Sequence, residues 1–271
     1  MAKVHALDTA IGNLIEKIDL TNTIIVFSSD NGGQPNHGGN NWPYRGQKGT
    51  FFEGGVKVPG FIFPRENFHH LEDSIVHVSD WLPTLLGFCG CKKNVGSRKL
   101  DGMDLNISKR KEILHNIDPM NKFTGPIDFI DWNLKQESGF NIRVSAGYRK
   151  GKYKIITGKV KNSEWTYPPE LQQDKTFGRK RIIRIRRSKV YRKLREKNSE
   201  GIVRLYDTEN DPLEKINLAR STEKDFKYRF ITLMMLNRLK SFNTTAVPVR
   251  YPPIDEVEPV DGFWLPWRDE L

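Results

Sequence analysis

The feature that most constrains the fold is an uninterrupted apolar run, Thr23 to Phe27, placed between an amphipathic segment and a polar turn. Apolar residues over 3–18 recur at steps of three and four, which predicts a helix. The run itself is β-branched and continuous, which predicts a strand buried on both faces. The turn at 28–33 reads Ser-Ser-Asp-Asn-Gly-Gly, and its glycines permit a sharp change of direction. This order is typical of an α/β fold, in which binding sites lie at the carboxyl ends of strands.

A long loop and two further elements follow this strand. Residues 34–55 are too rich in glycine and asparagine for a regular element, and a structured loop of that length is usually functional. Residues 56–63 predict another core strand. A helix is expected to begin near Asp80, which can serve as its N-cap, with Pro83 still in the first turn.

The pattern changes after about residue 140. Two short alternating runs, 142–148 and 152–157, predict a hairpin, and 203–206 predicts a third strand. Apolar residues over 225–242 again follow a helical period. Strands grouped with one helix suggest a small α+β domain with an antiparallel sheet. We therefore expect an α/β domain over 1–138 and a small α+β domain over 139–271.

The net charge of +11 belongs to one segment of the chain. Residues 178–197 hold eleven Lys and Arg and one Glu, and the rest holds 33 basic against 32 acidic residues. A nearly neutral body argues against a specific nucleic-acid-binding protein. The segment is expected to be an exposed insertion, with binding of a polyanion as the alternative. The chain has no apolar stretch long enough to span a membrane.

Two groups of side chains suggest sites for the binding of ions. Asp30 and Asn31 follow the buried strand and offer oxygens for a hard cation, although such residues also simply form turns. Downstream, Arg45 and Lys48 lie in a glycine-lined loop and could bind an oxyanion. The alternative there is a solvated loop in which Glu53 forms an ion pair. Cys89 and Cys91 have a C-x-C spacing that matches no common zinc site.

Several segments, in order and at close spacing, resemble the sulfatases, in particular arylsulfatase B and its relatives. They read SSDNGGQ at 28–34, GGNNWPYRGQK at 38–48, FEGGV at 52–56 and VSDWLPTL at 78–85. Weaker matches are LDGMD at 100–104, EILHNID at 112–118 and LYDTENDP at 205–212. The resemblance covers most of the chain and is weak at 160–200.

This resemblance implies a calcium-dependent sulfuric ester hydrolase with an alkaline-phosphatase-like fold, acting on sulfate esters that include sulfated glycans. Asp30 and Asn31 match two of the family's calcium ligands, and Lys48 matches the lysine that contacts the substrate sulfate. Arg45 has no family role to carry over. His115 lies in a family-like motif, where we expect a structural hydrogen bond.

The family's nucleophile is missing. It is a formylglycine made from the cysteine of a Cys-x-Pro-x-Arg motif, which this sequence does not contain. We therefore assign no catalytic residue and expect the chain to be the C-terminal part of a sulfatase, inactive alone. The other calcium ligands would lie on an N-terminal part. The alternatives are a non-catalytic sulfatase remnant that binds polyanions through 179–197, and a phosphatase or phosphodiesterase of the same superfamily.

Family likeness implies a lysosome or the secretory lumen, although we expect no signal peptide in this chain. Sequons begin at Asn106 and Asn243, as in a glycoprotein. The final tetrapeptide, Arg-Asp-Glu-Leu, resembles a signal for retention in the endoplasmic reticulum.

Overall fold

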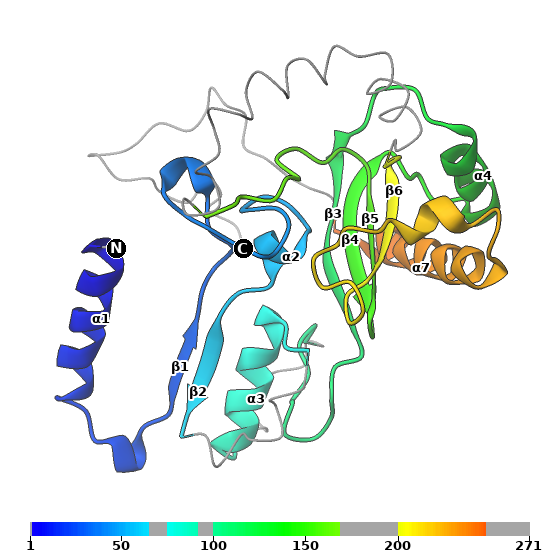
Figure 1. Cartoon of the computed structure of the whole chain (residues 1–271). Coiled ribbons are helices and arrows are strands. Elements are labelled where there is room, and N and C mark those ends of the chain that lie inside the picture. The colour runs from blue at the N-terminus through cyan, green and yellow to red at the C-terminus, as the bar shows by residue number, and fades with distance from the viewer. Residues whose placement is uncertain (1, 65–74, 92–99, 169–199, 248–271) are drawn as a thin grey trace, which may run out of the picture.

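The computed structural model describes residues 2–64, 75–91, 100–168 and 200–247 (Figure 1). The basic segment and the C-terminal tetrapeptide lie outside these ranges. The described chain is a mixed α/β structure with one two-stranded and one four-stranded antiparallel sheet. Its helices and strands are α1 Ala2–Ile15, β1 Ile25–Ser28, α2 Glu53–Val56, β2 Gly60–Phe63, α3 Trp81–Phe88, β3 Glu112–Lys122, α4 Phe129–Ser138, β4 Val144–Lys150, β5 Tyr153–Thr157, β6 Val203–Asp207 and α7 Phe226–Thr245.

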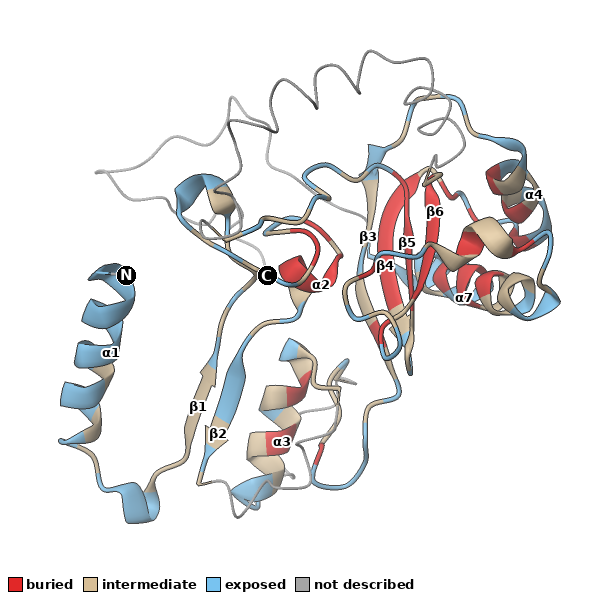
Figure 2. Ribbon diagram, viewed as in Figure 1, coloured by how far each residue is buried: buried red, intermediate tan, exposed pale blue. Residues whose placement is uncertain are grey.

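The N-terminal elements α1, β1 and β2 contain no buried residue. The predicted helix is confirmed as α1, but none of its residues is buried, and Figure 2 shows it exposed along its length. Strand β1 pairs with β2 from Ile25↔Phe63 to Ser28↔Gly60. The prediction of a strand buried on both faces is wrong, because no residue of β1 is buried and Ser28 is exposed. Strand β2, expected in a core, is mostly exposed.

Helix α3 begins at the expected position, but Asp80 does not cap it as predicted. Its buried carboxylate makes no hydrogen bond to the α3 backbone. Instead it accepts hydrogen bonds from the backbone amides of His77 and Met103 and pairs with Arg110. The helix starts as the pattern predicts, and the side chain at its start connects it to the segment that leads into β3.

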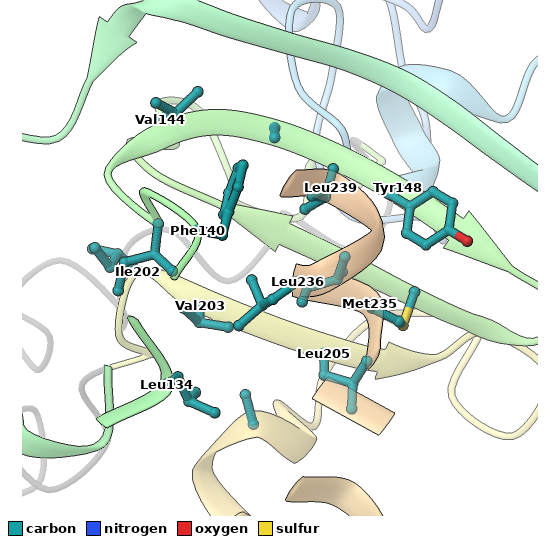
Figure 3. Close-up of a cluster of buried hydrophobic side chains, with 14 residues drawn as sticks. Leu134, Phe140, Val144, Tyr148, Ile202, Val203, Leu205, Met235, Leu236 and Leu239 are labelled. Atoms are coloured by element: carbon teal, nitrogen blue, oxygen red, sulfur yellow. The ribbon is translucent and has the colours of Figure 1, made fainter. Parts of the chain in front are cut away.

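The four-stranded sheet has the order β3-β4-β5-β6, and every neighbouring pair is antiparallel. This confirms the predicted hairpin and the third strand beside it. Helices α4 and α7 pack together on one face (Figure 1). That face carries the main core, in which α7 contacts β4 and β5 and side chains of β6 join the same cluster (Figure 3). Its labelled members include Leu134, Phe140, Val144, Tyr148, Leu205, Met235, Leu236 and Leu239.

The opposite face of the sheet is covered by the loop before α2. Alternate residues of β5 and β6 point to opposite faces, so Ile155 and Leu205 join the main core while Ile156 and Tyr206 face away from it. Ile156 and Tyr206 pack against Phe52, which is fully buried. Strands β5 and β6 are therefore buried on both faces, and the segment around residues 45–55 covers the face opposite α4 and α7.

The division expected at residue 138 falls inside this packed unit. Strand β3 precedes that position, yet it pairs with β4 from Glu112↔Lys150 onward. Leu134 of α4 lies in the main core. The unit that contains the four-stranded sheet thus includes residues from 112 onward. In the described part of the chain, no helix has the length and apolar character needed to cross a membrane.

Candidate functional site

Asp30 and Asn31 lie directly after β1. The Asp30 carboxylate is exposed, and its Oδ1 accepts a hydrogen bond of 2.9 Å from the backbone amide of Asn31. Asn31 is half-buried, and its carbonyl oxygen accepts a hydrogen bond from the Ser29 hydroxyl. A carboxylate and an amide oxygen suit a hard cation such as Ca²⁺, which takes about six to eight oxygen ligands. Within the described ranges, no three His, Cys, Asp or Glu side chains gather as a metal site.

The turn that carries these residues is packed against α2 through glycines. The amide of Gly32 donates a 3.0 Å hydrogen bond to the carbonyl of Gly55. A Cβ atom added at Gly32 would lie 1.8 Å from the carbonyl oxygen of Gly54, which is far inside van der Waals contact. Glycine is therefore required at position 32 for the two segments to approach this closely.

Asn41 fixes the second connection between the two segments. Its side-chain oxygen accepts a 2.7 Å hydrogen bond from the amide of Gly33, and its side-chain nitrogen donates to the carbonyls of Gly33 and Gly46. No role for Asn41 was predicted from the sequence. Its signal is an amide side chain between two glycine-rich segments, where it can satisfy backbone groups of both.

Lys48 is held close to this turn by its backbone. Its amide donates a 3.4 Å hydrogen bond to the carbonyl of Gly33, two residues after Asn31. The Lys48 side chain is exposed, and the structure gives it no ion pair among the described residues. The backbone thus brings together the segments that carry Asp30, Asn31 and Lys48.

The structure contradicts the prediction that Arg45 binds an oxyanion. Arg45 is 4% exposed, and its guanidinium is occupied by four groups of the protein. They are the carbonyl oxygens of Ser163 and Glu214, the Tyr206 hydroxyl and the Glu200 carboxylate. Burial alone would lower the pKa of Arg45, but the hydrogen bond with Glu200 and nearby charges raise it overall. Its donors are used within the protein, so Arg45 holds the loop against the four-stranded sheet.

Glu53, five residues after Lys48, forms an ion pair as the alternative expected, but the group is buried and not part of a solvated loop. Lys154 of β5 lies 2.6 Å from the carboxylates of both Glu53 and Glu214. Burial raises the pKa of each carboxyl group and Lys154 lowers it, with a net decrease for Glu53 and a net increase for Glu214. The three charges form a second buried contact between the loop and the sheet.

His115 of β3 does not make the structural hydrogen bond that its motif suggested. Its buried Nε2 has no hydrogen-bond partner in the described part of the chain. Desolvation, followed by the positive charges of Lys154, His77 and Arg149, lowers the pKa of His115 to about 3. The imidazole is therefore uncharged at neutral pH.

Comparisons with known proteins agree with the motifs at this site. The family model described as Sulfatase matches residues 1–91. Arylsulfatase J of Mus musculus is 33% identical over 99% of this chain and 44% of its own length. N-acetylgalactosamine-6-sulfatase of Mus musculus is 33% identical over 38% of this chain and 21% of its own length.

A solved structure whose title concerns the metabolism of multiple glycosaminoglycans by Bacteroides thetaiotaomicron is 16% identical, with a TM-score of 0.49. It matches 89% of this chain and 43% of its own. The chain spans less than half the length of the two mouse sulfatases. On the family model and the identity to arylsulfatase J, this chain belongs to the sulfatase family.

Proposed function

We propose that this chain forms part of a calcium-dependent sulfuric ester hydrolase of the arylsulfatase type. The observation that supports the proposal is that hydrogen bonds of Gly33 with Asn41 and with the backbone of Lys48 join the segment of Asp30 and Asn31 to the segment of Lys48. A cation held by Asp30 and Asn31, together with the ammonium group of Lys48, would suit an oxyanion such as the sulfate group of an ester.

Each proposed residue has a distinct task. Asp30 and Asn31 would hold Ca²⁺, which when bound supplies positive charge opposite the sulfate oxygens. Lys48 would contact the sulfate as a point charge, and its position would depend on the Gly33 and Asn41 hydrogen bonds. Arg45 and Glu53 would keep the loop seated on the sheet. No residue of this chain acts as the nucleophile in this proposal, and the other calcium ligands come from residues outside it.

The proposed architecture follows from these roles. The residues before β3 would form the distal part of an alkaline-phosphatase-like domain, and the four-stranded sheet would form a smaller unit that supports the loop. The name N-acetylgalactosamine-6-sulfatase points to a sulfated sugar for that relative, so we propose a sulfate ester carried by a glycan as the substrate of this one. The lysosome or the secretory lumen is the proposed location, which the exposed sequon residues Asn106 and Asn243 support.

The test uses a fusion. The part of mouse arylsulfatase J that precedes its matched region is joined to this chain and produced with a formylglycine-generating enzyme. We expect calcium-dependent hydrolysis of a chromogenic aryl sulfate by the fusion, and none by the 271-residue chain alone at any pH, because attack by bulk water lacks a positioned nucleophile.

Variants of the fusion assign the residues. Lys48→Ala and Asp30→Ala should each lower kcat/KM by at least about 100-fold, as does loss of a preorganised charge-stabilising group. Asp8→Ala, at an exposed position of α1, is the matched control and should retain activity. Turnover by the chain alone, or full activity of the Lys48→Ala fusion, would contradict the proposal.

A further inference from the structure

A second feature suited to an anion lies outside the candidate site. It is a pocket of about 570 Å³ at the start of β3, and neither Asp30, Asn31 nor Lys48 lines it. Its lining comes from the segment that leads into β3 and from the end of β4. The residues are Asp101, Met103, Ser108, Lys109, Arg110, Lys111, Glu112 and Lys150, which we call the β3 pocket.

The wall of the β3 pocket is fixed from behind by Asp80. The buried Asp80 carboxylate forms a two-point ion pair with the Arg110 guanidinium, with 2.6 Å from Nε to Oδ2. The same carboxylate accepts a 2.9 Å hydrogen bond from the backbone amide of Met103. Arg110 also donates to the carbonyl oxygens of Asp101 and Glu112. These contacts connect several lining residues to one buried group, so the pocket is already formed without a ligand.

Glu112, one of the two acidic residues that line the β3 pocket, is neutralised by an arginine of α7. The Glu112 carboxylate lies 2.6 Å from the Arg238 guanidinium of α7, and it also accepts a hydrogen bond from the Tyr148 hydroxyl. Lys109, Lys111 and Lys150 are exposed, and none of them forms an ion pair within the described residues. Three ammonium groups therefore line the pocket together with one further acidic side chain, that of Asp101, so basic residues outnumber acidic ones in the lining.

The size and chemistry of the β3 pocket limit its ligand. Sites for small molecules typically have volumes of roughly 300–1,000 Å³, so 570 Å³ suits a short saccharide and not the length of a polymer. Flexible ammonium groups suit rounded oxyanions such as sulfate or phosphate. Ser108 adds a hydroxyl group, and Met103 an apolar surface.

We propose that the β3 pocket binds a sulfated saccharide through Lys109, Lys111 and Lys150, as an anion site separate from Lys48. The choice of a sulfated sugar over another oxyanion rests on the proposed function, but the presence of an anion site does not. In a sulfated glycan with several sulfate groups, this pocket would hold a sulfate other than the one proposed to react.

The experiment uses methionine methyl groups as reporters, because the chain has five methionines and one of them, Met103, lines the pocket. The full chain is labelled with ¹³C at methionine methyls and titrated with a sulfated chondroitin disaccharide, its unsulfated form and inorganic phosphate. We expect the Met103 signal to shift saturably with the sulfated disaccharide and less with phosphate. The signals of Met234 and Met235 in α7 should not move.

Two triple variants of equal charge locate the binding. Lys109→Ala/Lys111→Ala/Lys150→Ala should weaken the Met103 response about tenfold, since three exposed charge contacts are lost. The control, Lys215→Ala/Lys224→Ala/Lys227→Ala, removes three exposed lysines elsewhere and should leave the response unchanged. All six positions are exposed, so both variants should fold.

The outcomes separate this inference from the proposed function. A Met103 response that Lys48→Ala does not change supports a distinct site, even if the fusion proves inactive. An equal response to the unsulfated disaccharide, an unchanged response in the pocket variant, or no Met103 response to any anion would overturn the site. A response to phosphate but not to the sulfated disaccharide would overturn the sulfated saccharide as its ligand.

Discussion

The guanidinium of Arg45 lies 2.8 Å from the carboxylate of Glu200, although 155 positions separate the two residues in the sequence. Arg45 is also placed 4.2 Å and 4.7 Å from the ring centres of Phe52 and Trp165. One buried side chain thus joins the loop that carries Lys48 to residues of the sheet unit that are distant in sequence. Because the contact spans the chain, its loss should affect the stability of the whole fold.

Replacing Arg45 by Lys should lower the free energy of unfolding by about 2–3 kcal/mol. Lysine keeps the charge but cannot make the four hydrogen bonds of the guanidinium fork, and Glu200 is partly exposed, which limits the penalty. Urea unfolding at neutral pH measures the change. The control is Lys48→Ala, at an exposed position in the same loop, which should alter stability by less than about 0.5 kcal/mol. Equal effects of the two substitutions would show that Arg45 is not a structural contact.

Lys154→Met should destabilise the chain most strongly near neutral pH and less in acid. The substitution leaves Glu53 and Glu214 buried without their shared cation, at a cost of about 3–5 kcal/mol for an uncompensated buried charge. Without Lys154, burial raises the pKa of both carboxyl groups above the unfolded value near 4.5. Each carboxyl group therefore destabilises the folded variant while it is charged, and this loss is recovered as the group becomes protonated in acid.

Urea unfolding from about pH 7 to about pH 4.5 tests this sign. The difference in the free energy of unfolding between Lys154→Met and the unmodified chain should decrease as the pH falls. Lys159→Met, at an exposed position, is the control and should show neither the loss nor the pH dependence. If this difference in the free energy of unfolding is constant across the pH range, the two carboxylates must be compensated by other partners in the variant.

Local patterns in the sequence predicted several helices and strands of the sheet unit. The hairpin β4–β5 and helix α7 follow from alternating and helical periods that the main core then uses. Helix α3 was also expected at its observed start. In these cases the signal is a period within the element itself, which does not depend on what the element packs against.

The errors concern residues whose partners are distant in sequence. Arg45 and Lys48 look alike in a glycine-rich loop, and only the contacts of Arg45 with residues 163–214 show that it is buried. The expected boundary at 138 came from a change in sequence pattern, but β3 pairs across it. The adjacency of the two site segments depends on backbone contacts of Gly32 and Gly33, which no side-chain pattern reveals.

His115→Leu should make the chain more resistant to acid. The folded pKa of His115, about 3, is below the unfolded value of 6.5, so the unfolded state binds more protons between these values. The contribution of His115 to stability is therefore complete above pH 6.5 and is lost as the pH falls, by at most about 1.4 kcal/mol per pH unit. Leucine has no proton to gain and leaves no buried nitrogen unsatisfied.

The comparison is the difference in unfolding free energy between His115→Leu and the unmodified chain at about pH 7 and about pH 5. We expect the variant to gain about 2 kcal/mol relative to the unmodified chain over this interval. His5→Gln, at an exposed position on α1, controls for removal of a histidine and should give no such difference. If the free energy of unfolding changes with pH equally in the unmodified chain and in His115→Leu, His115 must be protonated in the folded state, which would contradict this prediction.

Gly32→Ala should separate the two segments of the candidate site. A Cβ atom there would meet the carbonyl of Gly54 at 1.8 Å, and neither backbone can yield without breaking the Gly32–Gly55 hydrogen bond. Overpacking of this kind costs about 1–3 kcal/mol. The matched substitution, Gly12→Ala in α1, meets nothing within 4 Å and should stabilise the chain by about 0.5–1 kcal/mol because alanine favours the helix.

Calorimetry with Ca²⁺ then reports on the candidate site. Binding of Ca²⁺ by the unmodified chain should be weak, the affinity should be lower still in Gly32→Ala, and it should be unchanged in Gly12→Ala. Equal calcium affinity in both variants would show that the position of the acidic turn does not depend on its contact with α2.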